Sequence, residues 1–133
     1  MTTIKSYTDI SQSKKLADIL PIESADMSWK LVSYGDEAGS RHEPSLATYK
    51  TVSFFRDRIF PKDHTIPCWS LAALLDILPN IIGDCFKTIN CLYGWHCAYM
   101  NGNGEIIDND TEADNPVDAC VAMIEKLHEL NLL

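Results

Sequence analysis

A helix with one apolar face is predicted near the end of the chain, from Pro116 onward. Apolar residues recur there at intervals of three and four. They form one stripe, made of Val117, Cys120, Val121, Ile124 and Leu127, which Met123 and Leu130 widen along one edge. The Asn115 side chain can cap the first turn, and the N–H that Pro116 lacks would be unsatisfied there anyway. Such a stripe is expected to pack on a sheet.

Two runs rich in β-branched, aromatic and small apolar residues precede this helix, at residues 89–93 and 95–100, with Gly94 between them. Residues 101–104 read Asn-Gly-Asn-Gly, and Asn-Gly tolerates the positive φ angles of tight hairpin turns. We therefore predict that residues 95–100 and 105–108 form an antiparallel hairpin. With the helix, they would make a closing ββα unit.

Two further helices are predicted at residues 9–20 and 70–78. Asp9 and Gln12 have the spacing of a capping box, and Pro21 stops the first helix. Ser70 is a good cap for the second helix, which is apolar over most of its surface and is followed by Pro79.

The remaining elements complete a single domain covering residues 1–133. Strands are predicted at residues 29–34 and near 85–92, and polar loops at 35–44 and 61–67. Residues 49–60 fit both a strand and a helix pattern, and we assign them as strand. Helices and strands do not alternate regularly, which predicts an α+β fold: an antiparallel sheet of about four to five strands packed with about three helices.

Length and composition predict a cytoplasmic protein. A chain of 133 residues buries enough surface to fold without a metal or a disulfide. No apolar run approaches the about 20 residues that cross a membrane, and the N-terminus lacks the apolar core of a signal peptide. The five cysteines show no C-x-x-C spacing, so the default interpretation is buried free thiols.

The net charge of −8 is concentrated late in the chain. Residues 88–133 contain one lysine and eight acidic residues, which gives −7. Such a surface disfavours direct binding to nucleic acid and favours a basic protein partner. The candidate interaction surface is the acidic loop around residues 105–114, with Glu105, Asp108, Asp110 and Glu112. The alternative is an acidic loop that is simply solvated.

His96 and Cys97 are the residue types of a base and a nucleophile. Adjacent side chains of a strand point to opposite faces, however, which argues against a dyad between them. His42, His64 and His128 remain as alternative partners for Cys97, and none of them carries a local signature.

Metal sites find little support in the spacing of their candidate ligands. Zinc bound by Cys91, Cys97 and His96 would need ligands from both faces of one strand. Alternating acids at residues 108–114 resemble half of a calcium loop, but alanine stands where such loops need Gly and the final Glu, at Ala113 and Ala119. No cofactor is predicted.

Three stretches, residues 6–21, 66–75 and 113–120, resemble small uncharacterised proteins of phages, prophages and mobile elements in gut anaerobic bacteria. The resemblance implies an accessory protein of a mobile element. It implies no activity and no functional residue.

The leading hypothesis is a non-catalytic interaction protein that binds a protein partner or its own copy. A small enzyme or metal protein that uses Cys97 with a distant histidine is the first alternative. An acidic mimic of nucleic acid is the second, although such mimics usually carry more charge.

Overall fold

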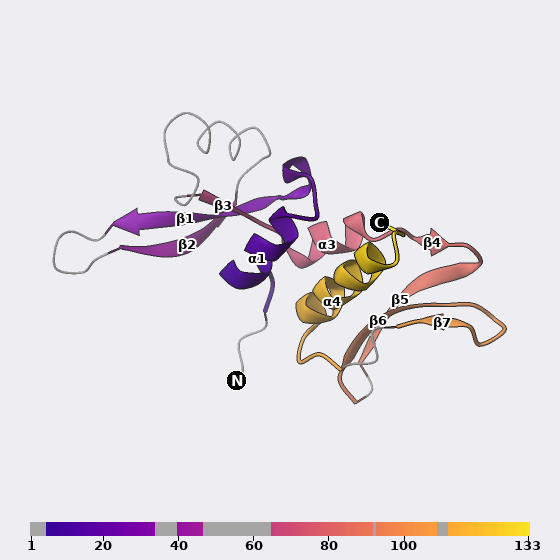
Figure 1. The fold of residues 1–133 in the computed structure, drawn as a ribbon. Coiled ribbons are helices and arrows are strands. Elements are labelled where there is room, and N and C mark those ends of the chain that lie inside the picture. The colour runs from indigo at the N-terminus through magenta and orange to yellow at the C-terminus, as the bar shows by residue number, and fades with distance from the viewer. Residues whose placement is uncertain (1–4, 34–39, 47–64, 92, 109–111) are drawn as a thin grey trace. The chain divides into compact units, whose positions relative to one another are not determined.

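The computed structural model describes residues 5–33, 40–46, 65–91, 93–108 and 112–133 (Figure 1). The chain forms two compact units. We call residues 7–73 the first unit, and residues 74–133 with the described residues before Tyr7 the C-terminal unit. Three α-helices and two antiparallel sheets in the described ranges confirm the α+β class.

Helix α1 (Ile10–Ala17) opens the first unit with the predicted capping box. The Gln12 backbone N–H donates to the Asp9 carboxylate at 2.8 Å, and the Asp9 N–H donates to the Gln12 side-chain oxygen at 3.1 Å. Two backbone donors of the first turn are thus satisfied reciprocally. A single turn of 3-10 helix, η1 (Ile22–Ser24), follows Pro21.

The sheet of the first unit has the order β2-β1-β3 and is antiparallel throughout. Strand β1 (Met27–Ser33) lies between β2 (Ser40–Leu46) and β3 (Thr65–Cys68). The predicted loops at 35–44 and 61–67 are therefore wrong where they overlap β2 and β3. Both strands contain a proline, which the outer strands of a sheet tolerate, and β2 is mainly polar as well. The strand assigned to residues 49–60 lies outside the described residues.

Thr8 organises the buried polar contacts of this unit. Its N–H donates to the Trp69 carbonyl at 3.0 Å, and its hydroxyl oxygen accepts from the Trp69 N–H at 3.2 Å. The Trp29 indole N–H donates to the Thr8 carbonyl at 3.1 Å. The buried apolar residues of this unit are Leu16, Leu20, Ala25, Ile66, Cys68 and Trp69.

Helix α3 (Leu71–Ile77) is stabilised by side chains at both ends. The Ser70 hydroxyl accepts from the Ala73 N–H at 3.2 Å, which confirms the predicted cap. At the other end, the Lys87 ammonium donates to the carbonyls of Leu75 at 2.6 Å and Leu78 at 3.0 Å. A cation at a helix C-terminus satisfies carbonyls that have no partner within the helix.

The sheet of the C-terminal unit is an antiparallel meander in the order β4-β5-β6-β7. Its strands are β4 (Ile81–Ile82), β5 (Cys85–Cys91), β6 (Trp95–Met100) and β7 (Ile106–Ile107). The predicted hairpin of residues 95–100 and 105–108 is confirmed, with a shorter second strand. Its turn is wider than a two-residue Asn-Gly turn, because the Asn101 side chain accepts from the N–H groups of Asn103 and Glu105. Only Gly104 in it has a positive φ.

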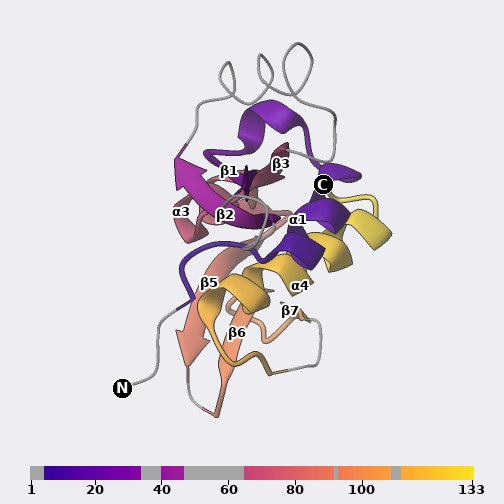
Figure 2. The same ribbon diagram turned by 90° about the vertical axis from the view of Figure 1, so that its left-hand side faces the viewer.

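Helix α4 (Pro116–Glu129) starts as the sequence predicts. The Asn115 side-chain oxygen accepts from the Asp118 N–H at 2.8 Å, and Lys5 forms an ion pair with Asp118 at 2.7 Å. The helix packs on β6, beside which it lies in both views (Figure 1, Figure 2). The predicted stripe is buried throughout: Val117, Cys120, Val121, Met123, Ile124 and Leu127. Leu130, at its edge, is 46% exposed.

Neither α4 nor any other helix in the described ranges has the length and apolar character that crossing a membrane requires.

Candidate interaction surface

Four apolar side chains form a row across the whole sheet of the C-terminal unit. Ile81 of β4 lies opposite Phe86 of β5, Phe86 lies opposite Met100 of β6, and Met100 lies opposite Ile106 of β7. Directly opposed residues of neighbouring strands project from the same face. We call Ile81, Phe86, Met100 and Ile106 the apolar row. Three strand spacings make it about 14 Å long between its end strands.

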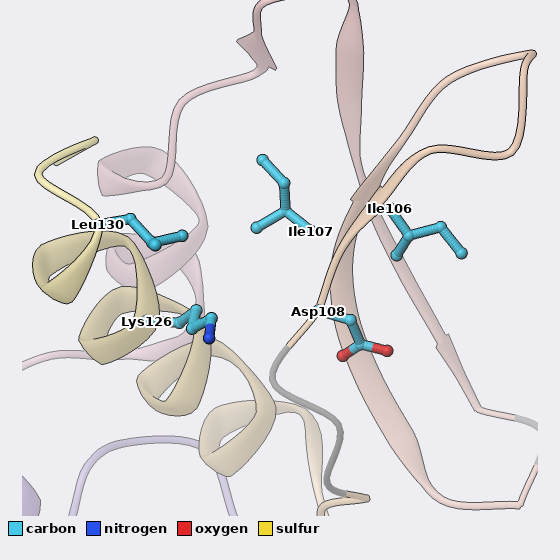
Figure 3. Close-up of a pocket in the computed structure, with 5 residues that line it drawn as sticks. All are labelled: Ile106, Ile107, Asp108, Lys126 and Leu130. Atoms are coloured by element: carbon cyan, nitrogen blue, oxygen red, sulfur yellow. The ribbon is translucent and has the colours of Figure 1, made fainter.

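The apolar row faces away from α4. Tyr99 of β6, which is next to Met100 in the chain and therefore on the opposite face, is fully buried. Figure 3 shows the same alternation in β7, where Ile107 points toward α4 and Ile106 lies on the other side of the strand. The exposed fractions are 66% for Ile81, 52% for Phe86 and 58% for Ile106, while Met100 is half-buried. Exposed apolar residues that lie side by side mark interaction surfaces more often than scattered ones do.

Two carboxylates lie just beyond the apolar row, where the β4–β5 and β6–β7 turns share one end of the sheet. The exposed residues Asp84 and Glu105, which we call the acidic rim, are linked through Asn101. The Asn101 amide N–H donates to Asp84 at 2.9 Å, and the Asn101 side-chain oxygen accepts from the Glu105 N–H at 3.0 Å. Burial raises the pKa of the Cys85 thiol, and the negative charges of Asp84 and Glu105 raise this pKa further.

The four acidic residues predicted from the sequence do not form one patch. Glu105 belongs to the acidic rim at the Met100 end of β6, whereas exposed Glu112 adjoins the Ala113–Trp95 bridge at the other end of β6. The five residue-to-residue steps from Trp95 to Met100 separate these ends by about 17 Å. Asp108 is half-buried, and Asp110 lies outside the described residues. Of these four residues, Glu105 belongs to the acidic rim, and Asp108 lines a cavity together with Ile106 of the apolar row.

A shallow cavity of about 440 Å³ lies between β7 and the end of α4 (Figure 3). It is lined by Ile106, Ile107, Asp108, Lys126 and Leu130. One acidic and one basic side chain border its apolar lining, so the cavity adds no net charge to the surface.

Two of the three lysines of the C-terminal unit contact other groups: Lys5 pairs with Asp118, and Lys87 binds the last carbonyls of α3. Lys126 lines the cavity together with Asp108 and with Ile106 of the apolar row. This unit contains these three lysines and ten acidic residues, for a net charge of −7. The unit that carries the apolar row therefore has a strongly negative net charge.

The structure separates His96 from Cys97. The two occupy consecutive register positions, opposite Asn90 and Ile89, so their side chains lie on opposite faces of the sheet. Cys97 lies on the face of the sheet that α4 covers, where the nearby Cys120 thiol lowers its pKa. The His96 Nδ1 atom is buried and has no hydrogen-bond partner within the described part of the chain.

The other candidate catalytic and metal-binding residues that the structure describes also lie apart from one another. His128 is exposed at the end of α4, and Cys91 is exposed at the end of β5. Across the described ranges, no three His, Cys, Asp or Glu side chains come together as metal ligands. The side chains of His42 and His64 lie outside the described part of the structure.

Sequence reasoning missed the apolar row. Its four members come from four strands and are isolated in the sequence, so only the register brings them together. Alternation along β5 and β6 was the available signal, because Phe86 and Met100 take the outward positions beside inward Cys85 and Tyr99.

No protein-family model matches the chain, and no curated protein or solved structure is significantly similar to it.

Proposed function

We propose that this protein is a non-catalytic interaction protein that binds a protein partner through the apolar row and the acidic rim. The partner would present an apolar patch bordered by lysine or arginine. The main support is the exposure of Ile81, Phe86 and Ile106 in one register-defined row.

The apolar row would supply most of the binding free energy. Phe86 occupies an inner position, between Ile81 and Met100, and aromatic residues near the centre of an interface are frequent binding hot spots. Covering its half-exposed ring removes apolar surface from water, which is favourable by about 25 cal/mol per Å².

The acidic rim would select the partner and speed association. Charges of opposite sign across an interface raise the association rate and reject partners of the wrong sign. Asp84 and Glu105 at the rim, within a unit of net charge −7, favour a basic protein. Binding to the phosphate backbone of nucleic acid is disfavoured by the same charge.

A second copy of the chain is a weaker candidate for the partner. Two copies that met face to face through the apolar row would bring two acidic surfaces together, and like charges across an interface are unfavourable. We therefore favour a different, basic protein. An accessory role in a mobile element, which the resemblance implies, agrees with such a partner, as does the cytoplasmic location expected from the composition.

The test uses the purified protein, immobilised and exposed to a lysate of the organism that encodes it, with the captured protein identified and purified. Phe86→Ser should weaken the measured affinity at least about tenfold. The double variant Asp84→Asn/Glu105→Gln should slow association and reduce its salt dependence.

Two matched controls change exposed residues outside the surface. Leu132→Ser removes an apolar side chain that is 42% exposed, and Glu129→Gln removes an exposed charge of α4. Both should leave binding unchanged. A partner that tolerates Phe86→Ser but is lost with Leu132→Ser would contradict the proposal, as would salt-independent binding.

A further inference from the structure

The thiols of Cys97 and Cys120 meet between the sheet and α4. Cys97 lies on the face of β6 that α4 covers, opposite Ile89, and Cys120 belongs to the buried stripe of the helix. Their exposed fractions are 1% and 0%, α4 packs on β6, and the two thiols are close enough for each to shift the pKa of the other. Two elements that are far apart in sequence thus bury two neighbouring thiols in one helix–strand interface.

We propose that Cys97 and Cys120 are a site of reversible covalent modification, forming a disulfide when a peroxide oxidises them. This inference is independent of the proposed function. In the first step, the Cys97 thiolate attacks one oxygen of hydrogen peroxide, and the O–O bond breaks to give a sulfenic acid and hydroxide. In the second step, the Cys120 sulfur attacks the Cys97 sulfur and water leaves. Overall, two thiols and one peroxide give one disulfide and two waters.

The environment of the pair assigns different roles to the two sulfurs. The Cys120 thiol lowers the pKa of Cys97, against the effect of burial, and the Lys87 charge lowers it further. The Cys97 thiol, together with burial, raises the pKa of Cys120. Cys97 is therefore the attacking thiolate, and Cys120 holds its proton until the second step.

Lys87 is held near the pair by backbone contacts. Its ammonium donates to the Leu75 and Leu78 carbonyls, and Lys87 lies opposite Tyr99, two residues along β6 from Cys97. The positive charge that favours the thiolate is thereby fixed in position. The negative charge of Asp108 opposes the effect of Lys87 by raising the pKa of Cys97. This effect of Asp108 is the smallest of those that act on the Cys97 thiol.

Burial selects the oxidant. Hydrogen peroxide is nearly as small as water, so we expect a small local opening of α4 to admit it. A glutathione-type disulfide would need a much larger opening. Among the described cysteines, Cys91 is exposed and should react with a large disulfide, whereas Cys68 and Cys85 are buried and their pKa values are not shifted by another thiol. The structure therefore separates the pair from the other three thiols.

The chain offers a direct readout of the modification. The sequence has no lysine or arginine between Lys87 and Lys126, so trypsin releases residues 88–126 as one peptide. In a Cys91→Ser background this peptide carries only Cys97 and Cys120. After treatment of the native protein with hydrogen peroxide, Cys97 and Cys120 should together lose two hydrogens, about 2 Da, and take up no iodoacetamide, whether or not Met100 or Met123 gains oxygen. Dithiothreitol should restore two alkylatable thiols.

Three comparisons complete the experiment. Cys120→Ser should leave Cys97 to gain about 16 Da per added oxygen. The tryptic peptide of residues 63–87, which carries both Cys68 and Cys85, should remain fully alkylatable after peroxide treatment and denaturation. A glutathione-type disulfide, added to native wild-type protein, should modify Cys91 alone.

The proposal is overturned if peptide 88–126 from the peroxide-treated Cys91→Ser protein takes up two iodoacetamide groups, or if it gains oxygen without losing two hydrogens. In the wild-type protein, digestion with a second protease that separates Cys91 from Cys97 shows whether Cys97 and Cys120 are joined, so the test does not depend on a variant. Partner binding plays no part in either measurement, so a failure here leaves the proposed function untouched.

Discussion

Replacing Gly94 by alanine should strongly destabilise the C-terminal unit. Gly94 separates β5 from β6 and has a φ of +146°, a backbone conformation that L-residues rarely adopt. A Cβ atom at this position would also lie 2.8 Å from the Cβ of Glu112. The close contact is with an atom fixed to the backbone, so rotation of a side chain cannot relieve it.

The two costs set the expected magnitude. Backbone strain of this kind costs about 1–3 kcal/mol, and an overpacked contact costs a similar amount. We expect Gly94→Ala to lower the free energy of unfolding by about 3 kcal/mol, measured from urea denaturation followed by circular dichroism.

Two other glycines of the same unit serve as matched controls. Gly83 has a φ of +62°, and a Cβ added there would meet nothing within 4 Å, so Gly83→Ala should cost only about 1 kcal/mol of strain. Gly102 has neither a positive φ nor a close neighbour, so Gly102→Ala should leave stability unchanged or raise it slightly. Adding Glu112→Gly to Gly94→Ala should recover the steric part alone. Equal urea midpoints for Gly94→Ala and Gly102→Ala would refute this reasoning.

Three further predictions concern side chains of the same unit. Lys87→Met should lower the free energy of unfolding by about 1–3 kcal/mol in urea denaturation, because the carbonyls of Leu75 and Leu78 lose their charged donor. Asn115→Ala should cost about 1 kcal/mol in the same assay, because the Asp118 N–H at the start of α4 loses its acceptor. Burial raises the pKa of Tyr99, so the folded state keeps a proton that the unfolded state releases near pH 10, and stability should fall as pH rises above about 10. Urea midpoints at several alkaline pH values should fall less steeply for Tyr99→Phe than for the wild type.

Local signals in the sequence predicted the helices and the central hairpin. The caps at Asp9, Ser70 and Asn115 form the predicted hydrogen bonds, because a cap depends only on residues within one turn of the helix. The stripe of α4 is buried for a related reason, since its period fixes one face whatever that face packs against.

Strand pairing was harder to predict where the sequence lacks alternation. Strand β2 reads Ser-Arg-His-Glu-Pro-Ser-Leu and has the composition of a loop. It is a strand because β1 pairs with it over seven residues, and this tertiary interaction leaves no local signal. Strand β4 is equally hard to recognise, because Ile81 and Ile82 are too few to show a period and follow directly after the end of a helix.

The candidate surface likewise has features that the sequence reveals and features that depend on strand pairing. Net charge is additive along the chain, so the acidic character of the C-terminal unit could be read from the sequence. The position of each charge depends on pairing, and the register places Glu105 and Glu112 at opposite ends of β6. The apolar row requires three correct registers at once, which no local pattern specifies.

The shape of the sheet favours binding through its face over strand addition at its edges. The end strands β4 and β7 contain two residues each, and short end strands leave few backbone groups for a partner strand. Binding through the face should bury Phe86 and leave the outward amides of β4 and β7 exchanging as in the free protein, whereas strand addition should protect those amides and tolerate Phe86→Ser. Hydrogen exchange of the complex, compared with the affinity of Phe86→Ser, distinguishes the two modes. Protection confined to the amides of β4 or β7 would assign the binding to a sheet edge and remove the apolar row from the interface.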